Sequence, residues 1–160
     1  MTLRIGHGVD VHRLVADRSL MLGGIQIPYP RGLAGHSDGD AVAHALADAV
    51  LGGAGLGDLG RHFPSSDPAW RDASGLELLG RAAAMAAEAG WRLTSAHVVA
   101  VADQPRLSPH TSRMAAAMAE ALGIGADQLA VSATTTDGLG LVGRGEGIAA
   151  SAVVLLSPVS

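Results

Sequence analysis

Apolar residues alternate with other residues near the start of the chain, in the segment IGHGVDVHRL that covers residues 5–14. Ile5, Val9 and Val11 occupy odd positions, which is the period of a half-buried β-strand, and Asp10 and His12 share the opposite face. In a half-buried strand the apolar face usually lies against the core and the polar face is the outer one. A polar outer face is ordinary in a strand, but an acid beside a histidine, flanked by glycines, also suits a binding site.

Further along the chain, the pattern predicts a hairpin, three helices and three more strands. The hairpin is SLMLGGIQIPYP (19–30), which turns at its two glycines, and residues 31–40 and 53–70 are expected to be loops. The helices are predicted from the residues that cap them. Ser37 and Asp40 form a capping box for a helix that ends at about Ala54, and Ser74 and Glu77 form one for a helix that ends at Gly90. A third helix begins at Ser108 and Pro109 and ends at Gly123. The strands cover residues 92–103, 129–137 and 146–157. Hairpins and helices without a regular repeat favour an α+β fold, a single domain over residues 1–160 with helices on one side of a mixed β-sheet.

Composition excludes several classes of function. A net charge of −4 and an aromatic content of 2% argue against a nucleic-acid partner, and no apolar run approaches the roughly 20 residues that span a membrane. The start of the chain lacks the apolar core of a signal peptide, so we expect a cytoplasmic protein. The chain has no Cys, and all 11 of its basic residues are Arg, which excludes thiol and lysine chemistry. A hydrophobic content of 48% reflects either an alanine-rich sequence or a subunit interface that covers apolar surface.

The first predicted helix contains the residues of a candidate metal site. Asp40, His44 and Asp48 are spaced one turn apart in DAVAHALADAVL (40–51), so they share a stripe of the helix. If Asp10 and His12 face this helix, they form with His44 a set of two nitrogens and one oxygen, a common catalytic zinc shell. Asp48 would then hold an imidazole in place. The alternative is a solvated or hydrogen-bonded stripe without a metal.

Two loops are suited to bind phosphate. His36 and Ser37 precede the first predicted helix, where backbone N–H groups favour an anion, although Ser37 could simply cap that helix. The segment SATTTDGLGLVGRGEG (132–147) combines threonine hydroxyls with a glycine-rich backbone that can approach phosphate oxygens, although a long hairpin turn also needs glycine. A metal site with two anion-binding loops favours phosphate chemistry over peptide hydrolysis.

Three long motifs carry a resemblance to a known family. GHGVDVHRL, GHSDGDAVAHALADAVLGGAGLGDLGRHFP and TTTDGLGLVGRGEGIA together resemble the 2-C-methyl-D-erythritol 2,4-cyclodiphosphate synthases of the non-mevalonate isoprenoid pathway, from about residue 4 to residue 156. The resemblance implies a lyase that cyclises 4-diphosphocytidyl-2-C-methyl-D-erythritol 2-phosphate and releases CMP. It also implies a homotrimer with active sites between neighbouring subunits, and in some relatives an isoprenoid diphosphate bound at the trimer axis.

The resemblance assigns roles to individual residues. Asp10, His12 and His44 correspond to ligands of one Zn²⁺ per subunit, and Asp137 to the ligand of a second divalent ion, Mg²⁺ or Mn²⁺. His36 and Thr135 correspond to catalytic residues that position the phosphates. Substrate contacts are implied for Asp10, His12, His36, Ser37, Asp58, Gly60, Phe63, Asp67, Ala102, Pro105, Arg106, Leu107, Thr134, Thr135, Asp137, Leu141 and Arg144.

The chain departs from the family pattern at four positions. Asp137 stands where the family usually has Glu, and Ser65 where Asp is common. Leu141 replaces a frequent Phe near the trimer axis, and Arg106 replaces a common Lys, which keeps the charge but changes the hydrogen-bonding geometry. Two other functions stay open from the residues alone: a zinc-dependent phosphohydrolase and a non-catalytic trimeric nucleotide- or isoprenoid-binding module.

Overall fold

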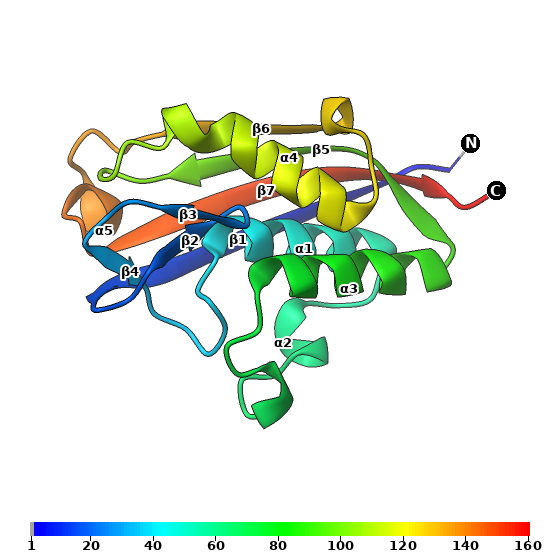
Figure 1. The fold of residues 1–160 in the computed structure, drawn as a ribbon. Helices are drawn as coiled ribbons and strands as arrows, with labels where there is room; N and C mark the ends of the chain where they lie inside the picture. The colour runs from blue at the N-terminus through cyan, green and yellow to red at the C-terminus, as the bar shows by residue number, and fades with distance from the viewer. Residues whose placement is uncertain (1) are drawn as a thin grey trace.

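A mixed five-stranded sheet forms one layer of the molecule in the computed structural model, which describes residues 2–160 (Figure 1). Its strands, in spatial order, are β4 (Arg31–Leu33), β1 (Arg4–Ala16), β7 (Gly147–Pro158), β5 (Trp91–Val101) and β6 (Leu129–Thr134). Only β5 and β6 pair in parallel. The hairpin predicted at residues 19–30 is confirmed as a separate two-stranded sheet of β2 (Leu20–Leu22) and β3 (Ile25–Ile27).

Three long helices cover one face of the sheet (Figure 1). They are α1 (Ala41–Ala54), α3 (Gly75–Glu88) and α4 (Thr111–Leu122). Helix α1 is buried along almost its whole length because it packs against β1 and β7 on one side and α3 on the other. The remaining helical pieces are short: α2 (Leu59–His62), α5 (Gly140–Gly143), η1 (Pro68–Trp70), η2 (Ser108–His110) and η3 (Ala126–Gln128). The predicted α+β fold is confirmed, and no helix of residues 2–160 is long and apolar enough to cross a membrane.

Several element boundaries differ from the sequence prediction. Helix α3 does begin after Ser74, whose hydroxyl accepts the Glu77 N–H at 3.0 Å. The helix predicted from Ser108 instead starts with the 3₁₀ turn η2 and becomes α-helical at Thr111. The expected loops at 31–40 and 53–70 contain strand β4 and the short helical pieces α2 and η1.

The capping box predicted at Ser37 is wrong, because Asp40 is the N-cap of α1. The fully buried carboxylate of Asp40 accepts the N–H of Ala43 at 2.9 Å, of Gly23 at 2.8 Å and of Gly24 at 2.7 Å. Burial raises the pKa of Asp40, while the three N–H donors oppose that rise. One side chain thus ties the start of α1 to the β2–β3 hairpin.

The two faces of β1 have the opposite arrangement to the usual one of a half-buried strand. The even face packs on α1, because Gly6 and Gly8 leave no side chain between the strand and the helix backbone. A Cβ atom at Gly6 would lie 1.8 Å from the carbonyl oxygen of Ala49, and one at Gly8 would lie 2.1 Å from that of Ala45. The apolar odd face remains open: Ile5, Val9 and Val11 are 73%, 56% and 49% exposed. Asp10 and His12 therefore point toward the helix layer and not away from it.

Candidate metal centre and neighbouring cavities

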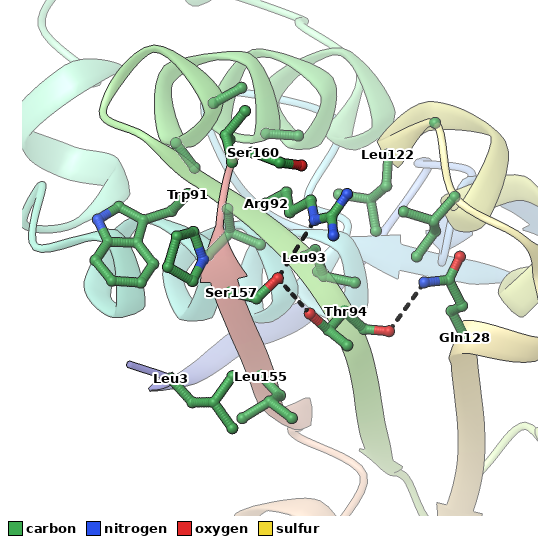
Figure 2. A pocket seen from close by; sticks show the side chains of 18 residues that line it. Leu3, Trp91, Arg92, Leu93, Thr94, Leu122, Gln128, Leu155, Ser157 and Ser160 are labelled. Carbon is green, nitrogen blue, oxygen red and sulfur yellow. Dashed lines mark hydrogen bonds between the residues drawn. The ribbon is translucent and has the colours of Figure 1, made fainter. Parts of the chain in front are cut away.

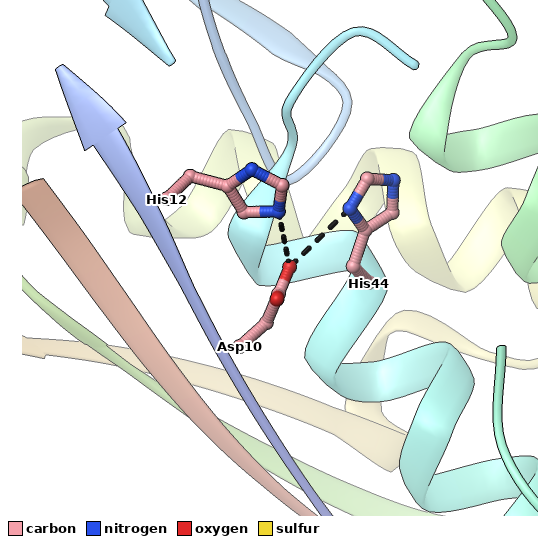
Figure 3. Close-up of side chains that lie close together, drawn as sticks. All are labelled: Asp10, His12 and His44. Atoms are coloured by element: carbon pink, nitrogen blue, oxygen red, sulfur yellow. Dashed lines mark hydrogen bonds and ion pairs between the residues drawn. The ribbon is translucent and has the colours of Figure 1, made fainter. Parts of the chain in front are cut away.

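The side chains of Asp10, His12 and His44 converge between β1 and α1 (Figure 3). Asp10 Oδ2 lies 2.7 Å from His12 Nε2 and 3.3 Å from His44 Nδ1. One ligand atom from each of the three residues lies within 4.8 Å of the other two. The structure therefore brings together the set that the sequence predicted, from a strand and a helix that are about thirty residues apart.

Hydrogen bonds on the far side of each imidazole orient the rings. His12 Nδ1 donates to the carbonyl oxygen of Ala34 at 2.6 Å, because a carbonyl oxygen can only accept. In a neutral ring, His12 Nε2 then carries a lone pair that faces Asp10. His44 Nε2 lies 3.2 Å from the hydroxyl of Ser37, and His44 is only 5% exposed. Lone pairs and a carboxylate that converge in this way suit a bound cation.

The protonation of the cluster follows from the same contacts. Burial would raise the pKa of Asp10, but hydrogen bonds from His12 and His44 and their charges outweigh it and lower the pKa to about 2. Burial would lower the pKa of His12, but the hydrogen bond and charge of Asp10 outweigh it and raise the pKa above 6.5. Asp10 is therefore ionised at neutral pH, and a proton competes with any metal ion for His12.

Asp48 does not hold an imidazole, contrary to the prediction. Its carboxylate accepts the Leu59 N–H at 2.7 Å, so it fixes the start of α2, and burial raises its pKa. The residue that contacts His44 on its far side is Ser37, whose hydroxyl became available because Asp40 caps the helix in its place. Spacing of one helical turn placed Asp48 near His44 but could not say which backbone donor it would meet.

A cavity of about 310 Å³ opens at the three side chains. Four other predicted residues line it: His36, Ser37, Gly60 and Phe63. His36 Nε2 donates to the carbonyl oxygen of Asp67 at 3.1 Å, which ties the wall of the cavity together. The carboxylates of Asp58 and Asp67 do not line it, because they cap α2 and η1 by accepting the N–H groups of Arg61 and Ala69.

Sequence reasoning missed one aromatic residue of this cavity, Trp70. Trp70 lines it together with Phe63, and the two rings meet edge to face with centroids 4.9 Å apart. The guanidinium of Arg81 lies 5.0 Å from the Trp70 ring and pairs with Glu77 at 3.1 Å. Ser65 also lines the cavity, at the position where the family pattern commonly has Asp. The scarcity of aromatic residues was the signal that could have singled out Trp70.

A second group of predicted residues lies around a different cavity, of about 550 Å³. It is lined by Ala102, Arg106, Leu107, Thr134 and Thr135, and it shares no lining residue with the first cavity. Pro105 belongs to the same segment of chain but does not line it. The residues matched to the metal and the residues of this second group thus line separate cavities within one chain.

Asp137, Leu141 and Arg144 line neither of these two cavities. Asp137 adopts a left-handed backbone with φ of 54°, and its N–H donates to the Thr135 hydroxyl at 3.2 Å. Arg144 forms an ion pair with Glu146 at 3.2 Å, and Leu141 is 42% exposed. The structure therefore places these three residues in or beside α5, outside both cavities.

Comparison with known sequences agrees with the motifs. Residues 3–157 match the model of the YgbB family. A 2-C-methyl-D-erythritol 2,4-cyclodiphosphate synthase of Moorella thermoacetica is 54% identical over 96% of this chain and 94% of its own. One of Geotalea uraniireducens is 51% identical over 96% of this chain and 98% of its own.

Solved structures share the fold as well. The bifunctional IspDF of Campylobacter jejuni superimposes with a TM-score of 0.95 at 38% identity, and the match covers 99% of this chain but 43% of that one. A CDP-bound 2C-methyl-D-erythritol-2,4-cyclodiphosphate synthase superimposes with a TM-score of 0.87 at 39% identity, over 96% of this chain and all of that one.

Proposed function

Because the chain belongs to the YgbB family and matches its named synthases over almost its whole length, we infer that it is a lyase of isoprenoid biosynthesis. It converts 4-diphosphocytidyl-2-C-methyl-D-erythritol 2-phosphate to 2-C-methyl-D-erythritol 2,4-cyclodiphosphate and releases CMP. The observation that supports this most strongly is the convergence of Asp10, His12 and His44 at a cavity large enough for part of such a substrate.

The chemistry requires little more than positioning. The 2-phosphate oxygen of the substrate attacks its own β-phosphorus, the bond from that phosphorus to the oxygen of the α-phosphate breaks, and CMP leaves with that oxygen. Since the nucleophile is part of the substrate, the protein must fold the substrate into an attack geometry and stabilise the transferring phosphoryl group. His36 and Thr135 are the residues we assign to hold the phosphates, and no dedicated general base is needed.

Two metal ions are part of this proposal. Asp10, His12 and His44 would hold Zn²⁺, and this donor set fits the ion because two imidazoles and one carboxylate are a common zinc shell. When bound, the ion supplies Lewis-acid polarisation of a phosphate oxygen. Asp137 would hold Mg²⁺ or Mn²⁺, since hard cations prefer oxygen ligands. The protein's own task at both places is to present ionised carboxylates and lone pairs in fixed positions.

We propose that the complete active site forms between subunits of a homotrimer. The open face of the sheet supports this, because Ile5, Val9 and Val11 on β1 and Val153 on β7 lie exposed on one face of paired strands. Apolar patches of this kind normally mark an interface. Separate cavities for the metal and for Arg106, Thr134 and Thr135 are also expected if a neighbouring subunit brings them together. The assembly would have three times the 16.0 kDa mass of the chain.

The other matched residues divide between the substrate and the trimer axis. We assign Ser37, Gly60 and Phe63, with Asp58 and Asp67 beside them, to the methylerythritol part, and Ala102, Pro105, Arg106, Leu107 and Thr134 to the cytidine diphosphate part. Leu141 and Arg144 would lie near the trimer axis, where an isoprenoid diphosphate could bind. Residues 1–160 would act as one domain in the cytoplasm, without a nucleic-acid partner.

Incubation with the CDP-linked substrate and divalent metal tests the function directly. The synthase releases CMP and the cyclic diphosphate in equal amounts, which phosphorus NMR resolves. Release of phosphate without a ring would instead make the protein a phosphohydrolase. Binding of CMP without turnover would make it a binding module.

Asp137→Asn tests the second metal separately. The variant keeps the size of the side chain and suits the turn before Gly138, where Asp137 and Gly138 have φ of 54° and 81°. Loss of the charge should slow turnover strongly and shift its dependence on Mg²⁺ concentration, while zinc content stays unchanged. Identical Mg²⁺ curves for variant and parent would leave Asp137 with a structural role in the turn only.

A further inference from the structure

A cavity near the chain termini belongs to neither of the groups described above. It has a volume of about 960 Å³, against about 310 Å³ for the cavity at Asp10, His12 and His44. It lies where β5 begins and β7 ends, bordered by α3 and by the turn after α4 (Figure 2). In Figure 1 this is the end of the sheet beside both termini, opposite to α5.

The cavity exists because the edge of β5 is open at this end. Strand β6 pairs with β5 only from Ala96 onward, so Trp91–Ser95 have no neighbouring strand on that side. The pairing with β7 shifts register between Leu93 and Ser95, which locally disrupts the ladder. The side chain of Gln128 partly takes the place of the missing strand, since its Nε2 donates to the carbonyl oxygen of Thr94 at 2.9 Å.

Hydrogen-bond donors gather at one part of this cavity. Ser157 is 8% exposed, and its hydroxyl accepts from Arg92 Nε at 3.3 Å and from the Thr94 hydroxyl at 3.1 Å (Figure 2). Two hydroxyl groups and the Arg92 guanidinium thus lie together at this part of the cavity, and each of them can donate a hydrogen bond.

The charge of Arg92 is also uncompensated. Arg92 takes part in none of the four ion pairs of residues 2–160. None of the described lining residues has an acidic side chain. A guanidinium beside two hydroxyl groups suits a carboxylate or phosphate.

The rest of the lining is predominantly apolar. Leu93, Leu122 and Ile124 form part of it, and the ring of Trp91 lies in the wall with the Arg4 guanidinium 4.2 Å from its centre. Apolar walls with a few convergent polar groups are the usual composition of a small-molecule site, and the volume lies within the usual range. We propose that this cavity binds an amphipathic anion, an aliphatic chain that ends in one carboxylate or phosphate. Its head lies against Arg92 and Ser157 and its chain against Leu93, Leu122 and Ile124.

Octanoate and octyl phosphate are the probes for the test, with octanol as the neutral analogue. The metal-loaded chain carrying Trp70→Phe has Trp91 as its only tryptophan, so emission reports on the cavity, and calorimetry gives the affinity independently. We expect saturable binding of both anions and binding of octanol that is about tenfold weaker. Arg92→Gln should weaken the binding of both anions by about the same factor.

A pair of matched variants on α3 tests the location. Ala87 is exposed and lines the cavity, whereas Ala84 is exposed on the same helix and does not. Ala87→Phe should fill the cavity and abolish binding, while Ala84→Phe binds like the parent; both should fold and keep basal turnover. Absence of saturable binding to the parent, unchanged affinity in Ala87→Phe or Arg92→Gln, or octanol binding as tightly as octanoate would overturn the proposal.

Discussion

The two faces of β1 carry residues of different kinds and meet different surroundings. The even face has Gly6 and Gly8 followed by Asp10 and His12, and it lies against α1. The odd face has Ile5, Val9 and Val11, and it is open in the single chain. The face with less hydrophobic area is thus the one that the helix covers.

Close approach explains this difference. A helix can approach a strand to backbone contact only where the strand has no side chains, and β1 offers that surface at its two glycines. Once α1 is held there, His44 meets Asp10 and His12, and a polar cluster forms at the edge of the buried contact. The apolar odd face is left for another surface, which we propose is a second copy of the chain.

Gly6→Val should have the largest effect. Its Cβ would overlap the carbonyl oxygen of Ala49, so the helix must move away from the strand, and we expect a loss of at least about 4 kcal/mol in the free energy of unfolding. Ile5→Val on the opposite face is the control and should cost no more than about 1.5 kcal/mol. Urea unfolding measures both, and equal midpoints for the two variants would contradict our account of the contact.

The second prediction compares two histidines. His44→Ala should remove most of the bound metal and lower turnover by more than about 100-fold. Loss of a metal ligand should weaken metal binding at least as much as loss of a residue that hydrogen-bonds the ligand. His7→Ala should retain both, since His7 lies on the odd face and bonds the Ser151 hydroxyl at 2.9 Å. Mass spectrometry of bound metal and a turnover assay decide it. Full metal content in His44→Ala would remove that residue from the site.

Val9→Asp tests the open face. A carboxylate there would be desolvated in any interface that this face forms, so the variant should sediment at the 16.0 kDa of one chain. Ala84→Asp, on the exposed side of α3, should sediment like the parent. If Val9→Asp keeps the mass of the parent assembly, the interface lies on another surface.

The smallest effect that we expect is a pH dependence of metal affinity. It should come from His12 on the even face of β1 and not from His7 on the odd face. Asp10 stays ionised down to about pH 2, so it adds no pH dependence to metal binding near neutrality. Because the pKa of His12 is raised, a metal ion must displace a proton from His12 as the pH falls. Affinity should therefore fall by up to about tenfold per pH unit below that pKa. The same slope is expected for His7→Ala, and a pH-independent affinity in the parent would show that His12 is not a ligand.

Much of the fold and of the metal cluster could be predicted from local signals. The first strand followed from its alternating pattern, the helices from their caps, including the one at Ser74, and the turn at Gly23 and Gly24 from residue type. The cap at Ser37 and the role of Asp48 were predicted wrongly, because each has several backbone donors within reach. Which donor such a side chain meets depends on neighbours that are distant in sequence.

The sequence alone determined the longer strands and helices and the α+β class, and it named the three residues of the candidate metal site, since spacing and residue type act over a few residues. Only the tertiary structure decided which face of β1 is covered, which residues line each cavity, and that β5 has an open edge beside Arg92. These features depend on how closely two backbones approach and where a neighbouring strand begins. An alternating pattern has the same period whichever face the helix covers, so the pattern could not show which face of β1 is buried.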